Sequence, residues 1–244
     1  MHNQTKSIVS VWDIYQPTKA LALVVACLLL WFLPFTHNLC LSLDVQTFAW
    51  LNHSLIYSRF AQLFWGYLNH PNETWLNIVF MLLVNILGIL SLPKAKRPQA
   101  AAMVLYCWVF FQLVLFATHI IFANWLHVQR NSPSIVFTPW VILSEALNIG
   151  NIKVYSHSSF PAGHVLVLVF WWRFIKLYCD RKTLMLASIT AIILTLPRLY
   201  SGAHWLSDVI FTIFYANLWF ELAYTLPLYN YTINKFTKIF TGGR

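Results

Sequence analysis

The chain has 244 residues, of which 59% are apolar and only 9% are charged. Soluble domains carry about 25% charged residues, so this composition indicates an integral membrane protein and excludes a disordered chain or a disulfide scaffold. The net charge of +9 comes from Lys and Arg in short clusters between apolar segments, which is not the pattern of a nucleic-acid surface.

Six apolar segments approach the length of about 20 residues that a helix needs to cross the hydrocarbon core. In chain order they cover residues 18–35, 75–92, 100–122, 163–178, 183–196 and 204–226. The stretch 44–70 has apolar residues at helical spacing, which suits a helix in the membrane interface or one packed on the bundle. We therefore predict one all-α domain, residues 1–244, built as a bundle of six transmembrane helices. The four cysteines are expected to be free thiols.

The positive charges predict the orientation of this bundle, because Lys and Arg near span ends stay in the cytoplasm. Twelve of the sixteen fall on one side of the predicted spans, and the other side holds Arg59, Arg130, Lys153 and Arg198. Both termini are therefore expected in the cytoplasm, and the segments 36–74, 123–162 and 197–203 outside.

Polar and ionisable residues at membrane depth are expensive, so the few that occur are candidates for function. Two outer segments stand out, SSFPAGHVLVL with His164 and LPRLYSGAHWLSDV with Arg198, His204 and Asp208. On a helix, His204 and Asp208 would share a face, and the carboxylate could accept a hydrogen bond from Nδ1 of the imidazole. Nε2 would then be free to act as a nucleophile. A purely structural pair, in which the histidine and the aspartate only hydrogen-bond each other at a helix end, is about equally expected.

The other candidates suit a phosphate group. The guanidinium of Arg198 has forked donors that match phosphate oxygens, although a lone arginine more often extends to the interface. Gly163 and His164 follow a proline turn at a predicted helix start, where backbone N–H groups favour an anion. Arg130 lies in the longest outer segment, and convergence with His164, Arg198 and His204 would give two cations, a nucleophile and an acid.

These residues resemble the type 2 phosphatidic acid phosphatase superfamily. The pattern Arg198-x5-His204-x3-Asp208, preceded by Pro161-x-Gly163-His164, is similar to the third and second motifs of that superfamily. Ala162 and Pro197 stand where those motifs have serine. If Arg130 is the arginine of the first motif, Lys-x6-Arg-Pro, then Ala123 replaces its lysine and Asn131 its proline.

The resemblance implies that His204 is a nucleophile forming a phosphohistidine, with Asp208 as its orienting partner. It further implies that His164 is the general acid and Arg198 a phosphate ligand, with no metal and no cofactor. Arg130 and Gly163 are added as phosphate-binding residues. A metal site is not expected on independent grounds, because neither a Cys/His cluster nor a His-Glu-x-x-His helix occurs.

Within residues 126–210 the chain is most similar to the lipid A 1-diphosphate synthase branch, with RNSPSIVFT, SEAL, SSFPAGH and LPRLYSGAHWLSD as the matching stretches. That branch implies transfer of the terminal phosphate of undecaprenyl diphosphate to the 1-phosphate of lipid A, at the periplasmic face of a bacterial inner membrane. One alternative is a phosphatase that uses water as the acceptor. Another is a catalytically silent binding or transport protein. The sequence leaves the acceptor and the oligomeric state open.

Overall fold

The computed structural model describes residues 17–70 and 73–241 of the chain, and within them every regular element is helical. The prediction of an all-α fold is confirmed. The elements in chain order are α1 (Pro17–Phe32), α2 (Pro34–Ser54), η2 (Leu55–Tyr57), α3 (Arg59–Tyr67), α4 (Glu73–Ser91), η3 (Lys94–Lys96), α5 (Arg97–His119), η4 (Ile120–Trp125), α6 (Pro133–Val136), α7 (Leu143–Leu147), α8 (Gly163–Lys176), α9 (Arg181–Tyr200), α10 (Leu206–Thr225) and α11 (Pro227–Phe240).

Each of the six segments predicted to cross the membrane falls on a helix, namely α1, α4, α5, α8, α9 and α10. By length and composition, three described helices can cross a membrane, Lys94–Trp125, Arg181–Tyr200 and Leu206–Thr225. The pair α1 and α2 raises this number to four if it counts as one span, although it is bent by 92°. The bend falls at Pro34, whose missing N–H and fixed φ end one helix and begin the next.

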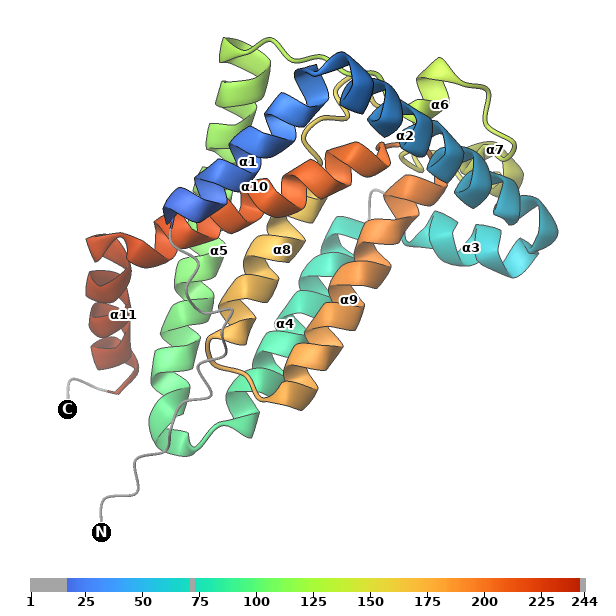
Figure 1. The fold of residues 1–244 in the computed structure, drawn as a ribbon. Helices are drawn as coiled ribbons and strands as arrows, with labels where there is room; N and C mark the ends of the chain where they lie inside the picture. Colours follow the sequence, from blue (N-terminus) through green and yellow to red (C-terminus); the bar gives the residue numbers. More distant parts are fainter. Residues whose placement is uncertain (1–16, 71–72, 242–244) are drawn as a thin grey trace.

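Helix α8 lies at the centre of the bundle, in contact with α5, α9 and α10 (Figure 1). Its side chains Phe170, Trp171, Phe174 and Ile175 are at most 1% exposed, so one side of this short apolar helix is fully buried in the core. Helix α1 packs along α10, and the two cross the bundle obliquely (Figure 1). Helices α2, α6 and α7 lie at the upper end of the view, where α8 begins and α9 ends.

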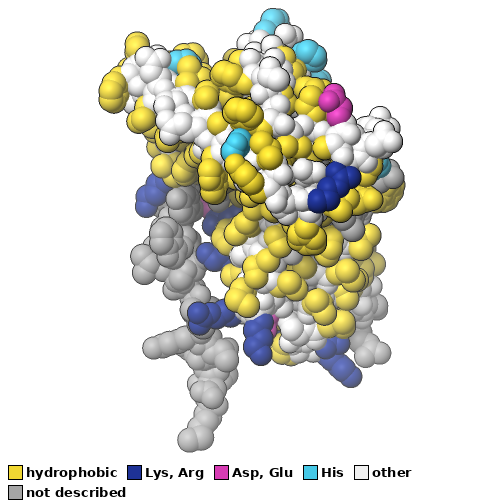
Figure 2. Space-filling view, turned by 90° about the vertical axis from the view of Figure 1, so that its right-hand side faces the viewer, with side chains coloured by type: hydrophobic (Ala, Val, Ile, Leu, Met, Phe, Trp, Pro, Cys, Tyr) yellow, Lys and Arg dark blue, Asp and Glu magenta, His cyan; other side chains and the backbone are white. Residues whose placement is uncertain are grey.

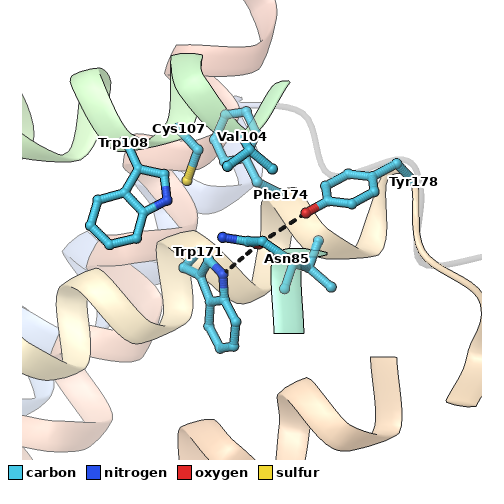
Figure 3. A pocket seen from close by; sticks show the side chains of 8 residues that line it. Asn85, Val104, Cys107, Trp108, Trp171, Phe174 and Tyr178 are labelled. Atoms are coloured by element: carbon cyan, nitrogen blue, oxygen red, sulfur yellow. Dashed lines mark hydrogen bonds between the residues drawn. The ribbon is translucent and has the colours of Figure 1, made fainter. Parts of the chain in front are cut away.

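A buried polar cluster joins α4 to α8 (Figure 3). The side-chain oxygen of Asn85 accepts hydrogen bonds from the indole N–H of Trp171 and the hydroxyl of Tyr178, each at 3.0 Å. Close by, Gly88 has no room for a side chain, because a Cβ there would lie 2.2 Å from Sγ of Cys179. The four cysteines are free, as the sequence predicted.

The two ends of the bundle differ in charge. Figure 2 shows dark blue Lys and Arg side chains mostly toward the lower end and histidines toward the upper end. The lower end holds the connections from α4 to α5 and from α8 to α9. Basic residues lie in the first connection or at the starts of the helices that follow: Lys94, Lys96, Arg97, Arg181 and Lys182. The candidate site residues lie at the opposite end.

Candidate active site

His204 lies in a tight turn between α9 and α10. The backbone N–H groups of Ala203 and His204 both donate to the carbonyl of Arg198, at 2.9 and 3.2 Å. Gly202 has φ +73°, a left-handed conformation, and a Cβ there would lie 2.5 Å from the ring of Phe48. A glycine is therefore required at this point of the turn. Because α10 begins only at Leu206, the prediction that His204 and Asp208 share a helical face is wrong.

The hydrogen bond made by Nδ1 of His204 fixes the chemistry of its ring. Nδ1 lies 2.6 Å from the carbonyl oxygen of Ser159. A carbonyl only accepts, so the proton is on Nδ1 and the lone pair is on Nε2. The side chain is 6% exposed. Burial, together with the positive charges of Arg198 and Lys153, lowers the pKa of His204 from 6.5 to about 3, so the ring is neutral at pH 7.

His164 faces the same ring from another helix. It is the second residue of α8, and the centroids of the two imidazoles are 5.0 Å apart. Its Nε2 is buried and has no hydrogen-bond partner among the described residues. Buried polar atoms are rarely left unsatisfied, so this atom indicates a place for a ligand or a water. The N-terminus of α8 also has no side-chain cap, which leaves the N–H of Gly163 available to an anion.

Arg198 and Lys153 supply positive charge to the site. Arg198 lies in the last turn of α9, and its carbonyl holds the His204 turn. Lys153 is exposed and lies on a segment between helices that is held by Asn69. The backbone N–H of Lys153 donates to the carbonyl of Asn69, and the side-chain amide of Asn69 donates to the carbonyl of Lys153. The sequence did not assign Lys153 to the site. The available signal was that it is one of only four cations predicted outside.

Arg130 reaches the site, but its guanidinium is held by two carboxylates. Nη2 lies 2.7 Å from Asp44, while Nη1 contacts Asp208 and lies 2.8 Å from the hydroxyl of Ser207. The guanidinium also stacks over the rings of Trp31 and Trp205, at 4.5 and 5.0 Å from their centroids. This geometry favours a positioning role for Arg130 over the phosphate contact that the sequence suggested.

Asp208 does not form the expected hydrogen bond with His204. The two side chains approach to 3.9 Å between Nδ1 and Oδ2, which is too long for a hydrogen bond. Oδ2 instead accepts from the backbone N–H of Trp205 at 3.0 Å, and Oδ1 faces Arg130. Asp208 therefore holds the start of α10 and anchors Arg130, while the carbonyl of Ser159 takes the orienting role at Nδ1.

Asp44 is another site residue that sequence reasoning missed. It lies on α2, is 1% exposed, and binds the N–H and the hydroxyl of Ser207 at 2.7 and 2.6 Å besides Arg130. A carboxylate at this helix start is favoured by the free N–H groups and the helix dipole. The signal in the sequence was an isolated aspartate inside the apolar run LCLSLDVQTFAWL, one of only seven acidic residues in the chain.

No metal site is formed among residues 17–70 and 73–241, since no group of three His, Cys, Asp or Glu side chains there could hold an ion. The arrangement is a neutral imidazole with a free lone pair, a second imidazole beside it, two nearby cations and an open helix N-terminus. Such a set can bind a phosphate and transfer it through nitrogen.

Two known proteins are similar to this chain. One is the lipid A 1-diphosphate synthase of Escherichia coli (strain K12), with 26% identity over 189 residues, 76% of each chain. The other is a transmembrane PAP2 type phosphatidylglycerolphosphate phosphatase from Bacillus subtilis, known from a crystal structure, with 17% identity and a TM-score of 0.45, over 86% of this chain and 94% of that one. No protein-family model matches the chain.

The motifs and the first relative support a place among the lipid phosphatases and phosphotransferases of the type 2 phosphatidic acid phosphatase superfamily. The similarity to a synthase that acts on a lipid supports the predictions of that superfamily and of an enzyme. The roles of the individual residues stay predictions.

Proposed function

We propose that this chain is a membrane phosphotransferase that moves the terminal phosphate of undecaprenyl diphosphate to the 1-phosphate of lipid A through a phosphohistidine at His204. The observation that carries the proposal is the pair of imidazoles. Nε2 of His204 has a free lone pair, and the buried Nε2 of His164 beside it lacks a partner. The similarity to the Escherichia coli lipid A 1-diphosphate synthase supports lipid A as the acceptor.

In the first step, Nε2 of His204 attacks the terminal phosphorus of the donor. A P–N bond forms as the bond to the bridging oxygen breaks, and the electron pair leaves with undecaprenyl phosphate. His164 donates a proton to that oxygen, since the negative charge of the bound diphosphate favours the protonated imidazole. The carbonyl of Ser159 stabilises the positive charge that develops on the His204 ring.

In the second step, an oxygen of the acceptor phosphate attacks the phosphorus held on His204. The new P–O bond forms as the P–N bond breaks, and the electron pair returns to Nε2. His164, neutral after the first step, takes the proton of the attacking oxygen. Arg198 and Lys153 offset the charge on the transferred group. Water in place of the acceptor would make the same enzyme a phosphatase, which is the second candidate function.

Following labelled phosphate from undecaprenyl diphosphate in detergent, with and without lipid A, separates the two candidates. We expect lipid A to accelerate loss of the donor's terminal phosphate and a diphosphorylated lipid to appear. Equal release of free phosphate in both reactions, with no diphosphorylated lipid, would establish the phosphatase instead.

The neutral, buried ring of His204 predicts that protein stability and phosphoenzyme formation respond differently to pH. Because its folded pKa of about 3 lies below the ordinary 6.5, the folded protein binds fewer protons than the unfolded one between those values. The contribution of His204 to stability is therefore full above pH 6.5 and declines as the pH falls toward 3. Between pH 7 and 5, thermal unfolding should shift to lower temperature while rapid-quench phosphoenzyme formation persists. A phosphoenzyme yield that titrates away near pH 6.5 would contradict this assignment.

We further propose that the enzyme lies in a bacterial inner membrane with six spans, both termini in the cytoplasm and the site on the periplasmic face. The concentration of Lys and Arg toward the end opposite the site supports this orientation (Figure 2). A cysteine at Tyr155, which is 48% exposed near the site, should react with an impermeant thiol reagent on intact spheroplasts. A cysteine at Ala95, exposed at the other end, should react only after lysis, and the reverse pattern would overturn the orientation.

A further inference from the structure

A cavity lies next to the reacting centre and shares only Gly163 with the catalytic and phosphate-binding residues described above. It has a volume of about 470 Å³ and lies between the end of α5 with η4 and the segment 157–163 that leads into α8. Its volume is in the range of sites for small ligands. Gly163 lines it, and the next residue is His164, whose ring faces His204. The cavity therefore ends where the proposed chemistry begins.

The polar lining suits a phosphate group. It contains side chains that can donate hydrogen bonds, and none of the residues that line the cavity is acidic; the polar ones are Thr118, His119, Gln129, His157 and Ser158. All but Thr118 are exposed, so they form the open rim. Lys and Arg are absent from this lining, whereas the transferred phosphate needs the cations near His204. Because no Lys or Arg in the lining would neutralise it, a phosphate bound in this cavity keeps its negative charge and can act as a nucleophile.

The surroundings suit a lipid. The inner lining is apolar, with Leu115, Phe122 and Phe160 among its residues. Outside it, Phe116, Trp125 and Leu126 are 66, 75 and 58% exposed. The π-helical turn η4 widens the end of α5 at this point, and such turns are frequent at functional sites. An amphiphile can place its head group at the rim and its chains along this exposed apolar side.

We infer that this cavity binds the phosphorylated head group of the acceptor lipid beside His164 and so decides between transfer and hydrolysis. The inference rests on the proposed phosphotransfer to lipid A. When the head group fills the cavity, an acceptor oxygen replaces water next to the phosphohistidine. An empty cavity admits water, and the intermediate is hydrolysed.

The test narrows the cavity at Ala123, whose small side chain lines it, so that water still enters but the head group no longer fits. Asn124→Leu is the control, because it places the same leucine at the next position of η4, where Asn124 is exposed and does not line the cavity. Purified full-length protein receives labelled undecaprenyl diphosphate with and without lipid A, and both free phosphate and diphosphorylated lipid are followed. Phosphoenzyme yield in the absence of acceptor reports whether each variant is folded.

We expect Ala123→Leu to reduce diphosphorylated lipid at least about tenfold, with phosphoenzyme yield and hydrolysis of the donor within about twofold of wild type. Asn124→Leu should match wild type. A double variant, His119→Ala with His157→Ala, should raise the KM for lipid A without changing the KM for the donor. His127→Asn, at an exposed position that does not line the cavity, should change neither.

Three results would overturn the inference. Equal transfer by Ala123→Leu and Asn124→Leu would show that the acceptor binds elsewhere. Loss of phosphoenzyme in Ala123→Leu, with His119→Ala and His157→Ala raising the KM for the donor, would make the cavity part of the donor site. Absence of any transfer to lipid A by wild type would remove the proposed function itself, and the acceptor site with it.

Discussion

Replacing His204 by alanine should abolish turnover and leave no labelled phosphoenzyme. Nε2 is the proposed attacking atom, and its lone pair is set free because Nδ1 donates to the carbonyl of Ser159 at 2.6 Å. Arg198 and Asp208 have no nucleophilic nitrogen to replace it, and the ring of His164, centred 5.0 Å away, is assigned to proton transfer. We expect kcat to fall by at least about a thousandfold.

A matched substitution separates this loss from misfolding. His204→Asn retains an amide N–H that can donate to Ser159 in place of Nδ1, but it has no atom at the position of Nε2. It should therefore keep the thermal stability of the protein while losing activity as fully as His204→Ala. Wild-type rates in either variant, or a phosphoenzyme in His204→Asn, would eliminate the covalent mechanism at this residue.

The residues that sequence reasoning located are those whose neighbours in the chain determine their place. Arg198 lies in the last turn of α9, His204 lies in the turn that follows, and His164 is the second residue of a helix, so motif spacing was enough to mark them. The carbonyl of Ser159 could not be predicted, because every residue has one and only the fold decides which faces Nδ1. The same holds for Asp208, whose distance from His204 depends on where α10 begins.

Contacts between distant segments account for the other differences. Asp44 and Ser207 are joined by two hydrogen bonds across 163 positions in the chain, and Arg130 joins them from a third segment. No periodicity in one segment can indicate such a meeting. The sequence also extended the first span to residue 35, whereas α1 ends at Phe32 because Pro34 begins a new helix at a bend of 92°.

Arg130→Ala should also be severe, but for a reason that can be distinguished from phosphate binding. It would leave Asp44 and Asp208, 1% and 0% exposed, without the cation between them. Removing one partner of a buried ion pair costs about 3–5 kcal/mol. The start of α10, which Asp44 and Asp208 hold, should loosen, and with it the turn that presents His204. We expect a lower unfolding temperature and transfer reduced at least about a hundredfold, with little change in the KM for the donor.

Asp44→Asn decides between the two roles of Arg130. If Arg130 balances the carboxylates, removing one of them lowers the cost of losing the guanidinium, because only Asp208 then remains buried without a counter-charge. The double variant Arg130→Ala with Asp44→Asn should accordingly be more stable than Arg130→Ala alone, with a coupling of about 0.5–3 kcal/mol in a double-mutant cycle. If Arg130 binds phosphate instead, Asp44→Asn alone should be nearly neutral, the two effects should add, and Arg130→Ala should raise the KM for the donor. That outcome would restore the role that the sequence first suggested for Arg130.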